Sequence, residues 1–463
     1  MLNNSQTALT STIAAIATPI GRGGVGVIRL SGPNSYQIAL ALTGRQAFKP
    51  RIARFCRFYD SDDTVIDDGL VLYFPAPHSF TGEDVIELQG HGGMILQQQL
   101  LTRVFELGAN QAVAGEFSAR AFDNDKLDLV QAEAIADAID ATSVAAAKSA
   151  MRSLTGEFSQ KINALLEQLI QLRLYVEAAI DFPDEEGVDF LADEHIAKQL
   201  RQVCEQLNTV LATAKQGQLL RDGVSVVIAG RPNAGKSSLL NRLAGQERAI
   251  VTDIAGTTRD ILQETIVLNG LTLNLTDTAG LRQTDDIVEQ AGIERARQAI
   301  TQADLLLMVY DAHREHEPLR LATELFGSLP NANSILMIAN KIDLSDNHQN
   351  LPKQFSSQEQ IYHPVYVSCK YGTGLEELVN QICDKVGFHP PENSLIARTR
   401  HLDALRRTQM ALQEADEQLH LFHAGELVAE SLRQAQLSLN EITGEFTADD
   451  LLGKIFGSFC IGK

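Results

Sequence analysis

The chain has 463 residues, which is too long for one hydrophobic core and predicts about three domains. Hydrophobic residues make up 44% of it without a long uninterrupted apolar run, so no transmembrane helix is expected, and the N-terminus lacks the basic region of a secretory signal. The formal net charge of −20 argues against a general nucleic-acid binder, so any RNA contact must be local or shared with a partner protein.

The cysteines indicate the cellular compartment. They are odd in number, scattered and never in a CxxC pair, so the sequence offers neither a zinc site nor a disulfide framework. This pattern fits a reducing environment, and we expect a cytoplasmic protein without membrane attachment. The five are Cys56, Cys204, Cys369, Cys383 and Cys460.

The first region, residues 1–125, is expected to form a compact α+β domain. Residues 21–26 match the dinucleotide pattern GxGxxG by letter, but residues 27–30 alternate as a strand, and no acidic residue follows about twenty positions on. The context therefore argues against a dinucleotide site. Further strands are predicted at 70–74 and 85–88, and a helix at 94–107.

Three charged residues, Arg29, Glu87 and Lys126, stand among apolar neighbours in or next to this region. Taken by themselves they are predicted to face solvent from half-buried elements, as most charged side chains do. The residues alone thus assign this region no ligand.

Two helical stretches, residues 126–221 and 387–463, flank the centre of the chain. Apolar residues recur at steps of three and four in both. In the first stretch, a proline among like charges at 181–186 predicts an exposed loop, and a further helix is expected to end near Gly217. Neither stretch completes a bundle, so we predict one all-α helical domain with residues 222–386 inserted, which gives the inserted module a lever on the helices.

The inserted stretch opens with strand, loop and helix signals around Gly230–Ser237. Alternating β-branched residues precede this loop, and an apolar run closed by Gly245 follows it. Free N–H groups and the helix dipole favour bound phosphate at such a helix N-terminus, and glycines allow close approach. Lys236 is expected to reach the β/γ-phosphates and Ser237 to place its hydroxyl on Mg²⁺. An ordinary glycine-rich turn is the alternative.

Three further motifs follow in the order of a phosphate-loop GTPase. A leucine-alternating strand runs into Asp277-Thr278-Ala279-Gly280, where Asp277 is expected to hold the Mg²⁺ shell and Gly280 to sense the γ-phosphate. Another strand ends at Asn340-Lys341-Ile342-Asp343, whose carboxylate selects guanine because guanine offers adjacent N–H donors and adenine does not. The backbone of Ser368-Cys369-Lys370 is predicted to meet the guanine oxygen. Four motifs in register predict a Ras-like α/β module that binds GTP.

The expected second switch departs from the Ras pattern. Leu281 follows the DxxG motif where Ras-type enzymes carry the glutamine that orients the attacking water, so another group must supply that function and the charge compensation. Arg282, Asp285, Asp286 and Glu289 lie just downstream. Glu289 is a candidate to act through a bridging water, although a solvated surface charge run remains the alternative.

Together these motifs resemble the MnmE/TrmE family, the GTPases of tRNA wobble-uridine modification. The resemblance runs from residues 21–24 to the terminal FCIGK, and it is most specific in the phosphate loop with Asn233, in TDIAGTTRD at 252–260 and in that tail. It implies an N-terminal folate-binding and dimerising domain, a helical domain split by the G domain, and a heterotetramer-type complex with the flavoprotein MnmG (GidA). The pair is expected to add an aminomethyl or carboxymethylaminomethyl group to C5 of uridine 34 of certain tRNAs, using 5-formyl- or methylene-tetrahydrofolate.

The resemblance also implies ion and folate ligands. It implies K⁺ on Asn233, Thr252, Ile254 and Thr257, and Mg²⁺ on Ser237 and Thr258. A monovalent cation there places positive charge near where an arginine finger would. The candidate folate contacts become Arg29, Glu87, Lys126 and Lys463.

The same resemblance makes Glu289 the water-orienting acid, and the candidate catalytic residues are Glu289, Asp277 and Cys460. The predicted GTP-binding residues come from the phosphate loop, the first switch, the DxxG motif and the two base-reading motifs. They are Asn233, Ala234, Gly235, Lys236, Ser237, Ser238, Thr252, Asp253, Ile254, Ala255, Gly256, Thr257, Thr258, Asp277, Thr278, Ala279, Gly280, Asn340, Lys341, Asp343, Ser368, Cys369 and Lys370.

A second class of function stays open, namely a regulatory GTPase of the Era/EngA type that acts in ribosome assembly and modifies nothing. A folate-type N-terminal domain and Cys460 separate the two hypotheses, because a pure switch needs neither. Cys460 also stands fourth from the end, as in a prenylation motif, but Gly462 and the final Lys463 fit that motif poorly.

Overall fold

The computed structural model divides the chain into two compact units, the first of residues 1–136, 153–203 and 407–463 and the second of residues 137–152 and 204–406. The residues that it describes are 11–19, 21–181, 194–245, 263–277, 299–344, 351–357, 359–390, 394–422, 424–444, 453, 455–457, 459 and 462. The predicted domain boundaries after residues 125, 221 and 386 stay predictions.

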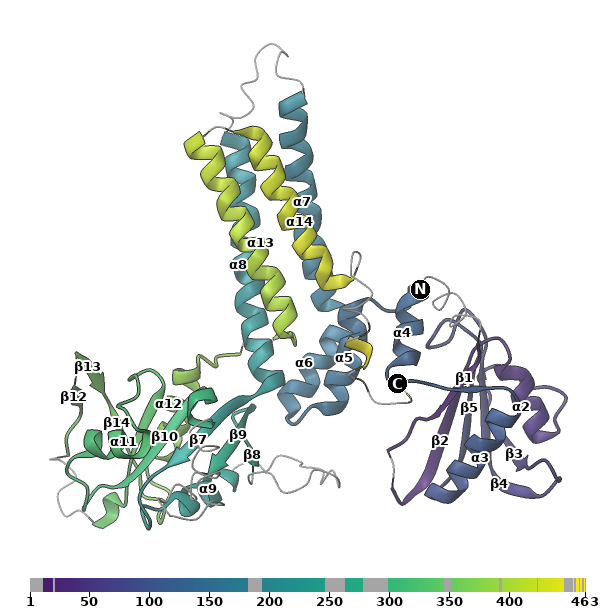
Figure 1. The fold of residues 1–463 in the computed structure, drawn as a ribbon, viewed down its shortest axis with the longest axis horizontal. Helices are drawn as coiled ribbons and strands as arrows, with labels where there is room; N and C mark the ends of the chain where they lie inside the picture. The colour runs from purple at the N-terminus through teal and green to yellow at the C-terminus, as the bar shows by residue number, and fades with distance from the viewer. Residues whose placement is uncertain are drawn as a thin grey trace. The chain divides into compact units, whose positions relative to one another are not determined.

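The N-terminal part of the first unit is a six-stranded sheet with helices on one face (Figure 1). Its strand order is β3-β4-β5-β2-β1-β6, with every described pair antiparallel except β1 and β6. The elements are β1 (Ile13–Ile16), β2 (Gly23–Ser31), α2 (Ser35–Thr43), β3 (Arg54–Tyr59), β4 (Val65–Phe74), β5 (Val85–Gly92), α3 (Met94–Glu106) and β6 (Asn110–Gln111). Residues 27–30 thus lie in a strand, as predicted, and because this strand already begins at Gly23, the glycines open no helix.

Alternation along the strands explains which side chains pack against α2 and α3, while Ile13 and Ala15 of β1 are buried against Phe117 on the other face. Ile28, Leu88 and Val71 are hydrogen-bond neighbours across β2, β5 and β4, and all three pack with residues of α2 and α3. Side chains therefore alternate, and the next residue along each strand points to the other face. There Leu70 and Phe55 are exposed on neighbouring strands.

The helices of the first unit come from both sides of the inserted module. Helix α7 (Glu157–Asp181) precedes the module, helix α14 (Gly425–Thr443) follows it, and the two lie side by side (Figure 1). Their apolar residues at helical spacing, such as Ile162, Leu432 and Leu439, are buried. This packing confirms the prediction of an all-α domain interrupted by a second module. The unit also contains α4 (Glu116–Asp123) and η4 (Gln418–Phe422), and it shares α5 (Leu129–Asp140), α8 (Glu194–Asp222) and α13 (Thr399–Glu417) with the second unit.

The second unit is an α/β layer structure. Its sheet has the order β14-β11-β10-β7-β9-β8, in which only β8 is antiparallel to its neighbour. Its elements are α6 (Val144–Leu154, shared with the first unit), β7 (Val224–Ala229), α9 (Lys236–Ala244), β8 (Gln263–Leu268), β9 (Leu271–Asp277), β10 (Leu305–Asp311), α11 (Pro318–Phe326), β11 (Ile335–Asn340), η2 (Ile342–Leu344), the hairpin β12 (Phe355–Ser357) and β13 (Gln360–Tyr362), β14 (Pro364–Tyr366) and α12 (Leu375–Val386).

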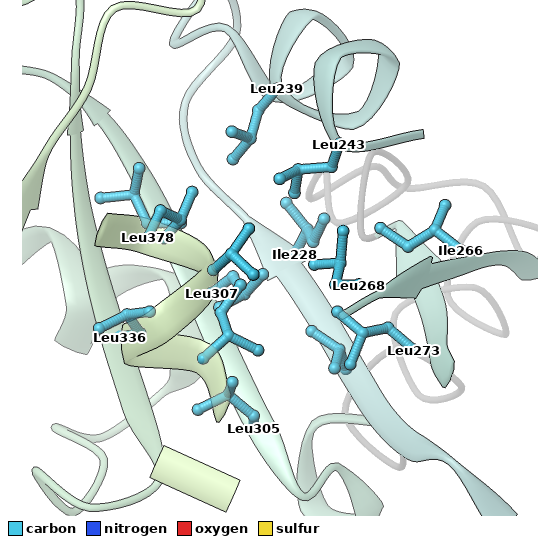
Figure 2. Packing of buried hydrophobic residues seen from close by; sticks show 14 of the residues in the cluster. Ile228, Leu239, Leu243, Ile266, Leu268, Leu273, Leu305, Leu307, Leu336 and Leu378 are labelled. Carbon is cyan, nitrogen blue, oxygen red and sulfur yellow. The ribbon is translucent and has the colours of Figure 1, made fainter. Parts of the chain in front are cut away.

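Two apolar cores cover the two faces of this sheet. In the larger core, Leu239 and Leu243 of α9 and Leu378 of α12 pack against Ile228 and Leu307 of the central strands (Figure 2). The other core sets residues of α11 against the opposite face of β10 and β11. A central strand with helices on both faces reads as a continuous hydrophobic run, which is why the sequence of β10 is apolar at six successive positions.

Helix α8 runs five residues beyond the predicted end at Gly217. A Cβ atom on Gly217 would lie 1.8 Å from the Leu395 carbonyl oxygen, so this glycine permits a close backbone approach inside the helix and does not end it. The helix ends at Asp222, and Gly223 with φ of 68° turns the chain directly into β7. The buried Asp137 accepts hydrogen bonds from Arg221 and from Arg398, which fixes this end of α8.

Candidate nucleotide-binding site

The phosphate loop follows β7 at the centre of the sheet and runs into α9. Two of its residues have positive φ, Asn233 at 62° and Gly235 at 102°, and this left-handed turn points successive backbone N–H groups to one side. Lys236 Nζ donates to the Gly230 carbonyl oxygen at 2.7 Å, so the ammonium group arches over the loop. Ser237 and Ser238 are exposed in the first turn of α9. A left-handed turn that leads into a helix N-terminus favours bound phosphate, and phosphate binding by these residues stays a prediction.

Asn340, at the end of β11, joins the phosphate loop to the loop at residues 368–370. The sequence predicts that this second loop contacts guanine, and we call it the base-reading loop. Its Nδ2 donates to the carbonyl oxygen of the buried Ala234 at 2.9 Å, and its Oδ1 accepts from the Cys369 backbone N–H at 3.1 Å. A Cβ atom on Gly235 would lie 2.1 Å from Asn340 Nδ2, so this approach requires glycine. Residues 106 and 29 positions away in sequence are thereby brought to one site.

The remaining base-reading residues lie around the same loop. Ser368 Oγ donates to Asp343 Oδ1 at 2.6 Å, which holds the carboxylate beside Ser368-Cys369-Lys370. Burial raises the pKa of the Cys369 thiol, which disfavours the thiolate, and the contact of its backbone with guanine stays a prediction.

Lys341 forms an ion pair with an acidic residue at the end of the neighbouring strand. Its Nζ donates to Asp311 Oδ2 at 2.9 Å, and Asp311 is the last residue of β10. Burial opposes ionisation of Asp311, but hydrogen bonds from Lys341 Nζ and from the His313 backbone outweigh it, and the pKa of Asp311 is lowered.

Arg242 is a site residue that sequence reasoning missed. It lies in the last turn of α9, where its Nε donates to the Cys369 carbonyl oxygen at 2.9 Å and its Nη2 to the Lys370 carbonyl oxygen at 2.7 Å. The helix that carries the phosphate loop therefore also holds the base-reading loop. No motif reports this role, because an arginine near a helix C-terminus is common for its interaction with the helix dipole alone.

Part of the predicted site lies outside the described residues. This holds for the whole first-switch segment Thr252–Thr258, for Thr278–Gly280, and for Glu289, Cys460 and Lys463. The backbone of Asp277 is described, and it is the register partner of Ile228 in β7. Asp277 thus ends its strand next to the start of the phosphate loop, at the sheet edge where ligands bind in doubly wound folds.

The predicted folate residues of the N-terminal sheet are partly brought together. Arg29 Nη2 and Glu87 Oε1 form an ion pair at 2.9 Å across β2 and β5, with the Arg29 guanidinium 5.5 Å from the Phe80 ring centroid. Both side chains are half-buried, so the prediction from the residues alone that they face solvent was wrong for these two. A guanidinium is weakly hydrated and stacks on aromatic rings, which makes this half-burial favourable.

Lys126 and the C-terminal tail approach the same end of the sheet. The exposed Lys126 lies with its Cγ and Cδ near Gly82, two residues after Phe80. A Cβ atom on Gly462 would lie 2.4 Å from the Ile16 carbonyl oxygen, and Ile16 pairs with Ile28, which directly precedes Arg29. Gly462 therefore lies against the strand next to the Arg29–Glu87 pair.

A family model described as GTP-binding protein TrmE N-terminus matches residues 12–126, and one described as MnmE helical domain matches residues 129–460. The chain belongs to the MnmE family. It is 73% identical to the tRNA modification GTPase MnmE of Psychrobacter arcticus, over 100% of this chain and 98% of the relative. It is 75% identical to that of Psychrobacter cryohalolentis over 98% and 96%, and 62% identical to that of Acinetobacter baumannii strain AYE over 98% of each.

Membership of the MnmE family confirms the interpretation of the chain as a tRNA modification GTPase, and with it GTP and Mg²⁺ as ligands of the central module. Among the described helices, none combines the length and the apolar content that a bilayer crossing requires.

Proposed function

We propose that the chain is a K⁺-stimulated GTP hydrolase that works with the flavoprotein MnmG on the wobble uridine of certain tRNAs. The pair adds an aminomethyl or carboxymethylaminomethyl group to C5 of uridine 34, with the carbon supplied by 5-formyl- or methylene-tetrahydrofolate. One observation carries the nucleotide part: Asn340 hydrogen bonds both to the phosphate loop and to the backbone of Cys369, so phosphate and base are read by one connected unit.

In the hydrolysis step, water attacks the γ-phosphate and gives GDP and phosphate. Mg²⁺ neutralises phosphate charge when bound, with Ser237 and Thr258 as its proposed ligands and Asp277 in its shell. K⁺ is proposed to sit beside Asn233, Thr252, Ile254 and Thr257, which offer neutral oxygens. Glu289 is proposed to orient the water. The exposed, left-handed Asn233 in the loop supports the K⁺ site, because its side chain leaves the backbone free to face phosphate.

The K⁺ role is tested by measuring kcat in KCl and in NaCl at equal ionic strength, which keeps general screening constant. We expect faster hydrolysis in KCl, and equal rates would refute the cation site.

A Glu289→Ala variant is expected to bind GTP normally and to hydrolyse it slowly, since the residue acts after binding. A parallel loss of GTP affinity would instead assign Glu289 a structural role.

The N-terminal sheet is proposed to bind the folate and to form the homodimer. The Arg29–Glu87 pair supports the first role, because a carboxylate and a guanidinium fixed side by side offer the acceptor and donor groups that a pterin ring and a glutamate tail require. The exposed Phe55 and Leu70 on the face opposite α2 and α3 support the second role, since exposed apolar neighbours mark surfaces that bind another protein.

Mass spectrometry of tRNA nucleosides separates the proposal from an Era/EngA-type regulator of ribosome assembly. In cells that lack the protein, uridine 34 is expected to stay unmodified, and expression of the wild-type chain is expected to restore the modification. Arg29→Met and Cys460→Ser chains are expected to retain GTPase activity and to fail in this rescue. Normal modified uridine in the deletion strain, together with immature ribosomal subunits, would instead assign the regulatory function.

A further inference from the structure

Charge is distributed very unevenly along this acidic chain. The first 59 residues contain no aspartate or glutamate, although the whole chain carries 59 of them and a net charge of −20. The same stretch contains seven cations: Arg22, Arg29, Arg45, Lys49, Arg51, Arg54 and Arg57. A strongly basic segment in an otherwise acidic protein indicates a local contact with a polyanion.

Five of the cations lie between residues 45 and 57 of the chain, and we call them the basic strip: Arg45, Lys49, Arg51, Arg54 and Arg57. It follows α2 and runs into β3, which is an edge strand of the N-terminal sheet. All five residues are exposed. Arg51 donates to the His78 carbonyl oxygen, and within the described residues none of the other four forms an ion pair.

Acidic residues near the strip gather at one end of it. Asp68 of β4 is the register partner of Arg57, and Asp60, Asp62 and Asp63 lie in the turn between the two strands. The free positive charge is therefore concentrated on Arg45, Lys49, Arg51 and Arg54, ahead of that turn. The exposed Ile52 lies between Arg51 and Arg54, so no buried residue interrupts this part of the strip.

Protection of the sheet edge explains only part of the strip. Charged side chains on an edge strand prevent pairing with other chains, and Arg54 and Arg57 suit that purpose. Arg45, Lys49 and Arg51 precede the strand and protect no edge. A second copy of this chain is a poor occupant as well, because two strips of like charge repel each other.

We propose that the basic strip binds the phosphate backbone of the tRNA, which rests on the proposed function. The remainder of the chain is acidic and repels RNA, so the strip both attracts the tRNA and orients it on the N-terminal sheet. The contact is to phosphates and is therefore sequence-independent, and base recognition is left to other groups.

The test measures binding of an unmodified tRNA transcript to the full chain, alone and with the partner flavoprotein, over a series of KCl concentrations. The test variant replaces Arg45, Lys49 and Arg54 with glutamine. The matched control replaces three exposed cations of α8, Lys198, Arg201 and Lys215, with glutamine, so that both variants lose the same net charge. Because the replaced residues are exposed, both variants are expected to keep the wild-type folding midpoint and GTPase rate.

If each replaced cation contacts a phosphate, the slope of log affinity against log salt falls by about 0.9 per contact, or roughly 2–3 in total. The affinity of the test variant at 0.1 M KCl then falls more than about tenfold, while the control stays within about twofold of wild type. Equal affinities and slopes for the two variants would overturn the proposal, as would a wild-type chain that binds no tRNA in either setting.

Two further outcomes distinguish failure of the tRNA contact at the basic strip from failure of the proposed function. If tRNA affinity is unchanged but association with the flavoprotein is lost, the strip binds an acidic protein and the RNA assignment is wrong. If tRNA binds through the strip and uridine 34 is nevertheless modified normally in the deletion strain, the proposed function fails and the RNA-binding surface stands.

Discussion

Replacement of Arg242 by methionine tests whether the helix behind the phosphate loop holds the base-reading loop in place. Methionine keeps the apolar stem and removes both hydrogen bonds to the Cys369 and Lys370 carbonyl oxygens, which measure 2.9 Å and 2.7 Å. Arg242 is exposed, so each bond is assigned about 1 kcal/mol, which is below the roughly 1.5–3 kcal/mol of hydrogen bonds to charged groups because solvent screens the guanidinium. Loss of both bonds destabilises the ordered conformation of the base-reading loop by roughly 2 kcal/mol. The loop then adopts its binding-competent conformation about 30-fold less often, and the apparent nucleotide affinity falls by that factor.

The assay is fluorescence titration with a labelled GDP and a labelled GTP, followed by hydrolysis at saturating GTP. Both nucleotides are expected to bind about 10- to 30-fold more weakly, since the loop contacts the base they share, while kcat at saturation stays near wild type. Arg320→Met is the matched control, because Arg320 is 73% exposed on α11. Affinities of the Arg242 variant equal to those of the control would refute the role assigned to Arg242.

Three other changes test neighbouring contacts. Gly235→Ala forces a Cβ atom to within 2.1 Å of Asn340 Nδ2 at a φ of 102°, and the strain and lost hydrogen bond, together about 2–3 kcal/mol, are expected to weaken GTP binding at least about 30-fold in the same titration. Asp343→Asn is expected to shift affinity from GTP toward XTP, whereas unchanged GTP affinity would mean that this carboxylate does not read the base. Lys341→Met removes a cation that lowers the Asp311 pKa, and the destabilisation of the variant is expected to be complete at neutral pH. This destabilisation is expected to fade as the pH falls below the unfolded value of 3.8, because protonated Asp311 no longer stabilises the native state. A thermal midpoint difference between variant and wild type that is constant from pH 7 to pH 3 would contradict this.

The GTPase motifs could be predicted from the sequence because each is short and lies where a strand ends or a helix begins. The strand before Gly230, the helix after it and the acid at the end of β9 each follow from periodicity and from one change of element. The all-α domain around an inserted module was predicted because each flank by itself lacked a partner face, and the packing of α7 on α14 supplies that partner. The predicted end of α8 was wrong because a glycine that ends a helix and a glycine that admits a close backbone look alike in sequence.

The features of the site that the sequence did not predict are long-range contacts, which no local pattern encodes. Asn340 and Arg242 connect the phosphate loop and its helix to residues more than a hundred positions away, and only the parallel order of β7, β10, β11 and β14 brings them to one edge of the sheet. Arg29 and Glu87 meet through the register of β2 and β5, since a shift of one residue would place them on opposite faces. The acid-free start of the chain is visible in sequence, but the exposure of its cations beside a sheet edge depends on the position of β3 in the sheet. Residue types and their spacing thus define the chemistry available to this chain, and the order of its strands determines which of those groups act together.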